Sequence, residues 1–426
     1  MKRVAWACIA VSGVLCCAAL LVWTLGVRDP ADVQAASTQA GASPQQVARG
    51  AYLAHAGNCM SCHTRRGGDH YAGGRPIVTP FGTLFTSNLT PDIGTGLGDW
   101  SAADFWRAMH HGRSRDGRLL LPAFPYASFT QVTREDSDAL FAYLKSLPAV
   151  AQPGLPHALR WPYGSQWALA IWRALYFRPG AFEPQPDRGA QWNRGAYLVR
   201  GLGHCNACHT ARNALGASDD ALDLEGGQIP MQGWYAPSLV RANEAGVGDW
   251  DAADVVQLLQ TGVSPRGSAL GPMAEVVLHS TQHLTRDDLL AMAAYLRALP
   301  GSTQRPAGEP AATARSSDAG ARLYGRHCAD CHGEQGEGVG LAYPALAGNR
   351  AVRMANVANL VLIVLRGGFA PATAGNPRPF GMPPFQILLA DSEVAAVLTH
   401  IRSAWGNQAG EVTELHVARL RGGTPR

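Results

Sequence analysis

Cysteine is almost absent from this chain outside a few fixed places. Of the nine cysteines, three lie within the first 17 residues, and the other six form three pairs with the spacing Cys-x-x-Cys. If the pairs serve one shared chemistry, no cysteine is left for a structural disulfide framework. The 36 lysines and arginines form no basic block, and the formal net charge is only +4. Nucleic-acid binding is therefore not indicated.

The signatures of a substrate-oxidising or nucleotide-binding enzyme are also missing. No Gly-x-Gly-x-x-Gly follows a strand pattern, and neither a phosphate-binding loop nor a Ser/His/Asp arrangement is present. No alternation of apolar and polar residues predicts strands. With 48 Gly and 28 Pro, the sequence predicts short helices joined by long loops. No site for oxidising a substrate is visible.

The first 35 residues differ in character from the rest of the chain. Lys2 and Arg3 precede an apolar run over 4–27, which is long enough to cross a bilayer. The residues Val-Gln-Ala at 33–35 form a plausible cleavage site. The pattern predicts that 1–35 is a signal peptide or a membrane anchor and leaves open which. Either places the body of the chain outside the cytoplasm.

Internal similarity organises the rest of the chain. Arg-Gly-Ala-Tyr-Leu occurs at 49–53 and at 194–198, and a looser Gly-Ala-Arg-Leu-Tyr occurs at 320–324. Each copy precedes a cysteine pair, and each repeat closes with an amphipathic helical pattern. The repeats predict an all-α chain of three small tandem domains.

The predicted domain boundaries follow from these repeats: 44–149, 191–300 and 318–405. Between the second and third, the segment 301–317 is rich in Pro, Ala, Ser and Thr, which predicts a flexible linker. The linker 150–190 is rich in aromatic residues. These aromatics either pack between the first two domains or form a docking surface for a partner or the membrane. The apolar run 357–365 predicts a buried helix, because it is too short to span a bilayer.

Each repeat carries one Cys-x-x-Cys-His motif. Two thiols at this spacing form thioethers with the vinyl groups of one haem, and the adjacent histidine supplies its imidazole to the iron. A thioredoxin-like redox pair would need a strand-helix-strand setting, and a zinc site usually joins two such pairs. The sequence therefore predicts three covalently bound haem c groups. The predicted attachment residues are Cys59, Cys62, Cys205, Cys208, Cys328 and Cys331, with His63, His209 and His332 as iron ligands.

Two methionines are the predicted ligands on the far side of the second and third irons. Met273 lies 64 residues after His209 in a Gly-Pro-Met segment, and Met382 lies 50 residues after His332 in Gly-Met-Pro-Pro. A methionine is more often a core residue. Here both lie in proline-bearing loops just before the last helix of a repeat, where a rigid backbone can aim a thioether at iron.

The first repeat breaks this pattern. Phe124 stands in the matching loop, and a phenyl ring cannot ligate iron. Met109, His110 and His111 are the candidates from the preceding helix. They either ligate the first haem or pack against it, and an open iron site is the remaining alternative.

These motifs, with Gly-Pro-Met-Ala-Glu-Val-Val at 271–277, resemble the triheme cytochrome c subunits of membrane-bound bacterial dehydrogenases for alcohol, gluconate or aldehyde. The resemblance covers about 46–405. It implies tandem c-type cytochrome domains in which Met273 and Met382 match the family's distal ligands. Phe124 departs from the methionine often found there and weakly favours the aldehyde-oxidising relatives.

The resemblance also implies a role and a place. A dehydrogenase catalytic subunit would oxidise its substrate in the periplasm, and this subunit would pass the electrons to membrane ubiquinone. It would act at the periplasmic face of the cytoplasmic membrane. The competing hypothesis is a haem enzyme, such as a peroxidase, acting at an open first haem.

Overall fold

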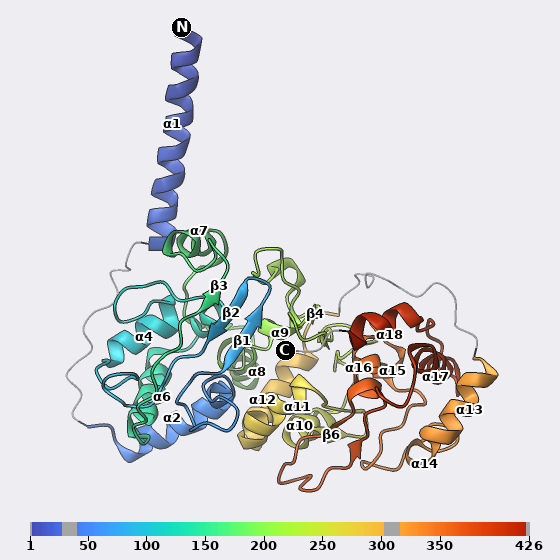
Figure 1. Ribbon diagram of the computed structural model, residues 1–426. Coiled ribbons are helices and arrows are strands. Elements are labelled where there is room, and N and C mark those ends of the chain that lie inside the picture. Colours follow the sequence, from blue (N-terminus) through green and yellow to red (C-terminus); the bar gives the residue numbers. More distant parts are fainter. Residues whose placement is uncertain (1, 28–40, 302–315, 423–426) are drawn as a thin grey trace. The chain divides into compact units, whose positions relative to one another are not determined.

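The computed structural model describes residues 2–27, 41–301 and 316–422 (Figure 1). The chain separates into two compact units. Unit 1 comprises 1–54, 62–183 and 214–217; unit 2 comprises 55–61, 184–213 and 218–426. The first repeat thus lies mainly in unit 1, whereas the second and third repeats share unit 2. Most of the predicted linker 301–317 and the predicted cleavage site at 33–35 lie outside the described residues.

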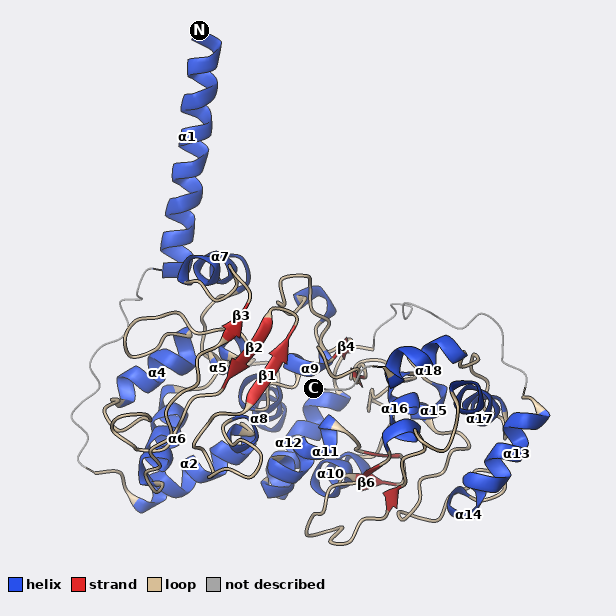
Figure 2. Cartoon of the chain, viewed as in Figure 1, coloured by secondary structure: helices blue, strands red, loops and turns tan. Residues whose placement is uncertain are grey.

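Unit 1 is built mainly from helices around the first repeat. Its helices are α1 (Lys2–Val22), the π-helical turn η1 (Trp23–Val27), α2 (Pro44–Ala56), α3 (Cys59–Cys62), α4 (Ala102–His111), α5 (Tyr126–Phe129), α6 (Arg134–Ser146) and α7 (Gln166–Tyr176). The last two residues of α2 and the first three of α3 belong to unit 2. The strands of unit 1 are β1 (Pro76–Thr79), β2 (Gly82–Phe85) and β3 (Ala158–Leu159). They form one antiparallel sheet in the order β1-β2-β3 (Figure 2).

The first and last helices of the repeat cross at a glycine. A Cβ on Gly50 of α2 would lie 1.9 Å from the carbonyl oxygen of Ala139 in α6, so only glycine permits this approach. The neighbouring Arg49 Nε donates to the Asp136 carboxylate of α6 at 2.8 Å. Thr133 caps α6 by accepting a hydrogen bond from the Asp136 amide. The Arg-Gly of the repeated segment is therefore a helix-crossing signature.

Unit 2 repeats this construction. The second repeat contains α8 (Ala190–Tyr197), η2 (Leu198–Leu202), α9 (Asn206–His209), η3 (Asp220–Leu222), β4 (Gly227–Gln228), β5 (Tyr235–Ala236), α10 (Ala252–Thr261), β6 (Val263–Ser264), β7 (Gly267–Ser268), α11 (Pro272–His279), η4 (Thr281–His283) and α12 (Arg286–Arg297). A Cβ on Gly195 would lie 1.9 Å from the Ala291 carbonyl oxygen. Arg194 donates to Asp288 through Nε at 2.8 Å and Nη2 at 2.7 Å. The α8–α12 crossing matches that of α2 and α6.

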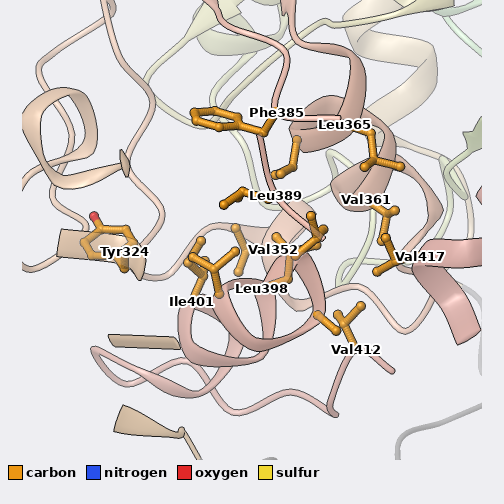
Figure 3. Packing of buried hydrophobic residues seen from close by; sticks show 14 residues of the cluster. Tyr324, Val352, Val361, Leu365, Phe385, Leu389, Leu398, Ile401, Val412 and Val417 are labelled. Carbon is orange, nitrogen blue, oxygen red and sulfur yellow. The ribbon is translucent and has the colours of Figure 1, made fainter. Parts of the chain in front are cut away.

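The third repeat, which forms the C-terminal part of unit 2, has a hydrophobic core of its own (Figure 3). Its elements are α13 (Asp318–His327), α14 (Ala329–His332), α15 (Arg350–Arg353), α16 (Ala358–Arg366), β8 (Gly368–Phe369), β9 (Gly381–Met382), α17 (Asp391–Ser403) and α18 (Glu414–Arg421). The predicted buried helix over 357–365 is α16, whose Val361, Leu362 and Leu365 are buried. Gly320 repeats the glycine crossing, with a Cβ 2.4 Å from the Ala396 carbonyl oxygen.

The core of the third repeat continues beyond the predicted boundary at residue 405. Val412 and Val417 belong to the same buried cluster as Leu398. The buried Arg402 donates to the carbonyl of Gly410 at 2.7 Å and to that of Met354 at 2.9 Å. An arginine on the inner face of α17 thus ties down the segment that leads to α18, which hydrophobic periodicity could not reveal.

The sequence predicted no strands, and the structure corrects this with short hairpins. Strand β1 pairs with β2 from Pro76–Phe85 to Thr79–Gly82, while the pairs β4-β5, β6-β7 and β8-β9 contain two residues per strand. Strands this short contain too few residues to display an alternating pattern. The architecture remains mainly helical.

The apolar start of the chain is a helix that packs on α7. Val22 joins a small cluster with Leu169 and Ala170. Buried Arg113 and Arg173 donate to the Gly26 carbonyl at 3.4 and 3.2 Å. Over residues 2–27, 41–301 and 316–422, no helix combines the length and hydropathy needed to cross a bilayer.

The aromatic linker 150–190 is only partly packed. Phe177 is buried, with 2% of its surface exposed, and its ring contacts Tyr126 and Arg173 of the same unit. Trp161 and Trp167 are instead 81% and 53% exposed, and their rings lie 6.3 Å apart edge to face. Packing of this segment between the first two domains, or docking to a partner or the membrane, stays a prediction.

Candidate haem sites

The three cysteine pairs lie at one-turn helices. Cys59 and Cys62 bound α3, Cys208 and His209 end α9, and Cys331 and His332 end α14. In a helical turn, residues three apart share one face, so both thiols of a pair can reach one flat ligand. None of the six forms a disulfide among the described residues. Each helix thus offers two thiols and one imidazole to the same neighbourhood.

A backbone carbonyl orients each of the three histidines. The Nδ1 atom of His63 lies 2.8 Å from the Ser87 carbonyl oxygen. For His209 the partner is the Pro237 carbonyl at 2.6 Å, and for His332 the Pro344 carbonyl at 2.9 Å. Because a carbonyl only accepts, Nδ1 carries the proton and Nε2 presents its lone pair. This tautomer suits coordination of iron through Nε2.

The electrostatic setting keeps these imidazoles neutral. Burial lowers the pKa of His63, His209 and His332, and the carbonyl hydrogen bond only partly opposes it. A protonated imidazole has no lone pair left for a metal. The fold thus holds all three side chains in the ligating form at neutral pH.

Burial has the opposite effect on three of the thiols, because it raises their pKa. It raises the pKa of Cys205 to about 12 and that of Cys328 to about 11. It also raises the pKa of Cys208. Reactive or metal-binding cysteines usually need a stabilised thiolate, which this apolar setting disfavours. A thioether is uncharged, so burial in this apolar setting does not penalise it.

The third repeat brings its predicted site residues to one cavity of about 330 Å³. Cys328, Cys331, His332 and Met382 all line it. Val263 and Leu270 of the second repeat close part of the wall, so this cavity is shared within unit 2. An apolar pocket with two thiols, an imidazole and a thioether matches what a haem c requires.

Met273 follows a rigid turn in the second repeat. Gly271 has a φ of 55°, and Pro272 begins α11. A Cβ on Gly271 would lie 2.8 Å from the Trp234 ring, so glycine is required for both conformation and space. The turn fixes the backbone immediately before Met273, which lies in the first turn of α11 and not in the loop that the sequence predicted.

The structure gives the register between the first and second repeats. Leu120 donates its amide to the Gly112 carbonyl at 2.8 Å, and Ala269 donates to the Gly262 carbonyl at 2.7 Å. Both glycines are left-handed helix ends. The fourth residue after Leu120 is Phe124, and the fourth residue after Ala269 is Met273. Phe124 therefore occupies the position of the second repeat's methionine.

The alternative ligands of the first repeat are all buried on α4. Met109 lies three residues before Gly112, where the second repeat has the buried Leu259 before Gly262. Met109 thus occupies a core position of the repeat. His110 stacks on Trp106 with centroids 4.3 Å apart, and the His111 ring meets His110 edge to face at 4.6 Å. The sixth ligand of the first haem stays a prediction with these alternatives.

Known proteins are similar to this chain over most of its length. The cytochrome c family profile matches residues 47–148 and 317–405. The gluconate 2-dehydrogenase cytochrome c subunit of Pantoea cypripedii is 40% identical over 423 residues, covering 95% of this chain and 94% of that protein. The chain belongs to the family of dehydrogenase cytochrome c subunits.

Two further relatives in this family carry different substrate names. The cytochrome c subunit of alcohol dehydrogenase (quinone) from Gluconacetobacter polyoxogenes is 39% identical over 393 residues, 88% of this chain and 84% of that one. The fructose dehydrogenase cytochrome subunit of Gluconobacter japonicus is 33% identical over 417 residues, 91% and 85% of the two chains. Similarity to these cytochrome subunits therefore does not identify the substrate of the dehydrogenase.

Sequence reasoning missed the second layer of each site in this cytochrome subunit. The carbonyls of Ser87, Pro237 and Pro344 orient the proximal histidines, and no side-chain pattern marks a carbonyl. The pairing of Arg49 with Asp136 was also missed. Its signal was present, because an arginine precedes the repeated glycine and an acidic residue begins the closing helix.

The residues present fit haem c. The cysteine pairs would form the thioethers, the three histidines would coordinate iron through Nε2, and Met273 and Met382 would supply thioether sulfur in the second and third repeats. A bound haem supplies a one-electron couple between Fe(II) and Fe(III). The chain's own contribution is to fix the ligands and to surround them with apolar side chains, both of which tune the potential.

Proposed function

We propose that this cytochrome c subunit carries three haem c groups and passes electrons from a dehydrogenase catalytic subunit to membrane ubiquinone. Its place would be the periplasmic face of the cytoplasmic membrane. The observation that carries the proposal is the threefold recurrence of a Cys-x-x-Cys-His turn whose histidine Nδ1 is tied to a carbonyl. One such turn per repeat gives three one-electron centres in one chain.

The haem count has a direct test. Protein exported from a cell competent for haem attachment should show the mass of three haems by intact-protein mass spectrometry. Replacing Cys205 and Cys208 with alanine should remove one haem. The matched control replaces Cys16 and Cys17, which lie outside the motifs. A wild-type chain with fewer than three haems would contradict the count.

Electron relay is tested with the partner present. Co-purified catalytic subunit and its substrate should reduce all three haems, and added ubiquinone analogue should reoxidise them. In the variant lacking Cys205 and Cys208, flow to the quinone should fall. Flow at the wild-type level would exclude the second haem from the relay.

A haem enzyme acting at the first haem is the second candidate. Phe124 at the position of Met273 is the observation that favours it. Carbon monoxide or cyanide should then perturb one haem of three. If neither ligand binds, the first iron is fully coordinated and the enzyme hypothesis fails.

The aromatic face of α7 supports attachment to a membrane. Trp167, Ile171 and Leu175 recur every four residues, so they share one helix face, and all three are exposed. Exposed Trp161 lies beside Trp167. Tryptophan and aliphatic side chains on one face are typical of helices that lie in the lipid headgroup region. We infer that this face contacts lipid.

Vesicles of phosphatidylethanolamine and phosphatidylglycerol test this face. The double variant Trp161→Ser, Trp167→Ser should sediment less with the vesicles than the wild type does. Ile387→Ser is the control, because Ile387 is also exposed but lies in the third repeat. Equal loss in both variants would show that the α7 face has no special role.

A further inference from the structure

Two backbone segments of the second repeat hold His209. The ring Nδ1 of this histidine donates to the Pro237 carbonyl at 2.6 Å. In addition, the Gly226 amide donates to the His209 backbone carbonyl at 2.8 Å. A Cβ on Gly226 would lie 2.4 Å from the Tyr235 hydroxyl and 2.8 Å from the Ser238 amide nitrogen, so the two segments pass close to one another. Whatever fixes these segments therefore also fixes the histidine.

A buried ionic cluster joins the same two segments. Its members are Glu225, Arg241 and Glu244. Arg241 Nη2 lies 2.8 Å from Glu225 Oε2, and Arg241 Nη1 donates to Glu244 Oε1 at 3.4 Å. The side chains of the three residues are 13%, 11% and 5% exposed, in the same order. Glu225 lies in the first segment, and the other two lie just beyond the second, so the cluster ties together both supports of His209.

The Glu244 carboxylate makes two further bonds. Its Oε2 atom accepts from the Ser238 amide at 2.8 Å and from the Tyr235 hydroxyl at 2.9 Å. Burial and the neighbouring Glu244 charge raise the pKa of Tyr235, so the phenol keeps the proton that it donates. Ser238 directly follows Pro237, whose carbonyl orients His209. Glu244 is therefore a positioning residue, because it acts on the histidine through this segment.

The charges of the ionic cluster do not cancel. Two carboxylates and one guanidinium leave one negative charge close to the supports of His209. Solvent and salt screen buried charges only weakly. Since Fe(III) is one unit more positive than Fe(II), a nearby negative charge stabilises the oxidised state. The charge of the cluster therefore lowers the midpoint potential of a haem whose iron His209 ligates.

The first and third repeats hold the equivalent loops with neutral side chains. In the first repeat Asn88, directly after Ser87, accepts from the Thr90 amide at 2.9 Å. In the loop that orients the third histidine, the Leu346 carbonyl accepts from Asn407 Nδ2 at 3.0 Å. Both asparagines are buried. A neutral amide is thus sufficient to hold such a loop, and the negative charge of the second repeat is not needed for that task.

We propose that the ionic cluster lowers the midpoint potential of the second haem while it clamps the two segments that hold His209. The proposal rests on the proposed function, since it requires a haem attached at Cys205 and Cys208. In the relay this haem takes up one electron from the dehydrogenase subunit and gives it up again, and no proton moves in the cluster. The cluster sets how readily the second iron accepts that electron.

The test measures midpoint potentials of the full haem-loaded chain at neutral pH by spectroelectrochemical titration. Glu244→Gln and Glu225→Gln each remove the net negative charge of the cluster, and the double variant makes the cluster positive. Asp251→Asn is the matched control, because it removes an acidic charge of the same repeat that is exposed and screened by solvent. The titration step that disappears when Cys205 and Cys208 are replaced with alanine belongs to the second haem.

Each single variant should raise the potential of the second haem alone. At a fixed potential, the ratio of reduced to oxidised second haem should rise severalfold, and a tenfold rise corresponds to about 59 mV for a one-electron couple. The double variant should raise the ratio further, because the remaining guanidinium disfavours Fe(III). The control should leave all potentials unchanged. Mere loosening of the site would admit water, which stabilises the more highly charged Fe(III) and shifts the potential the other way.

An unchanged or lowered potential in either single variant that keeps its second haem would overturn the proposal. If Glu244→Gln loses this haem, Glu225→Gln decides alone, because it leaves the bonds of Glu244 to Ser238 and Tyr235 in place. Loss of the haem from both variants, seen by intact-protein mass spectrometry, would refute the tuning of the potential. Failure of the proposed function looks different, since the wild-type chain itself would then lack the second haem.

Discussion

Replacing Gly195 with alanine should force helices α8 and α12 apart. The new Cβ would lie 1.9 Å from the Ala291 carbonyl oxygen and 2.8 Å from the Tyr295 Cβ. Carbon does not approach backbone oxygen closer than about 3 Å, so the crossing must open by about 1 Å. The neighbouring Arg194–Asp288 pair, joined by two hydrogen bonds, spans the same crossing and would be stretched with it.

The cost follows from packing. Forcing an extra carbon into a close-packed contact usually costs 1–3 kcal/mol, and here the obstacle is backbone that cannot rotate away. We expect about 2–3 kcal/mol, which lowers the unfolding temperature of a region this size by roughly 5–10 °C. Circular dichroism of the haem-loaded protein measures this shift.

Gly325→Ala is the matched control. Gly325 lies within α13, and a Cβ there would meet no atom within 4 Å. Alanine should therefore stabilise this helix slightly, by about 0.5–1 kcal/mol. Gly320→Ala should fall between the two, because its Cβ would lie 2.4 Å from the Ala396 carbonyl oxygen. If Gly195→Ala is no less stable than Gly325→Ala, the close helix crossing is refuted.

Three further predictions concern two candidate axial positions and the ion pair between Asp249 of the second repeat and Arg350 of the third. Met382→His should lower one midpoint potential in a redox titration, since imidazole in place of thioether stabilises Fe(III); unchanged potentials would remove Met382 from the ligand set. Phe124→Met should abolish any binding of carbon monoxide to the first haem, and continued binding would place Phe124 away from the iron. Arg350 holds the pKa of Asp249 below its usual value. The pair therefore stabilises the fold at pH values above the ordinary aspartate pKa, and this stabilisation is lost as the pH falls below about 4. In unfolding curves measured at several pH values, Asp249→Asn should lose less stability on acidification than the wild type. An equal loss in both proteins would contradict this prediction.

Much of the fold could be predicted because the repeats carry strong local signals. The closing helices have buried residues where the periodicity placed them: Leu140, Leu144, Leu289 and Leu398 are each at most 1% exposed. The short hairpins and α18 were missed. Two-residue strands carry no period, α18 has a single buried residue, Val417, and Arg402 holds the segment before α18 through the Gly410 carbonyl.

The candidate sites, too, could be predicted from the sequence only in part. The Cys-x-x-Cys-His motif fixes its own chemistry, because spacing along one helical turn determines which atoms face a common ligand. The first repeat was harder. Phe124 could be matched to Met273 from the sequence, but whether Met109 packs as core or faces a haem depends on neighbours that the local sequence does not name.

The sequence by itself determined the three Cys-x-x-Cys-His motifs and the family, since both can be identified from the order of residues along the chain. Tertiary structure alone decided that carbonyls of Ser87, Pro237 and Pro344 orient the histidines. These contacts join residues 12 to 28 positions apart, and the acceptors are backbone carbonyls, which every residue possesses. Only the folded chain selects which of those identical groups comes within hydrogen-bonding distance.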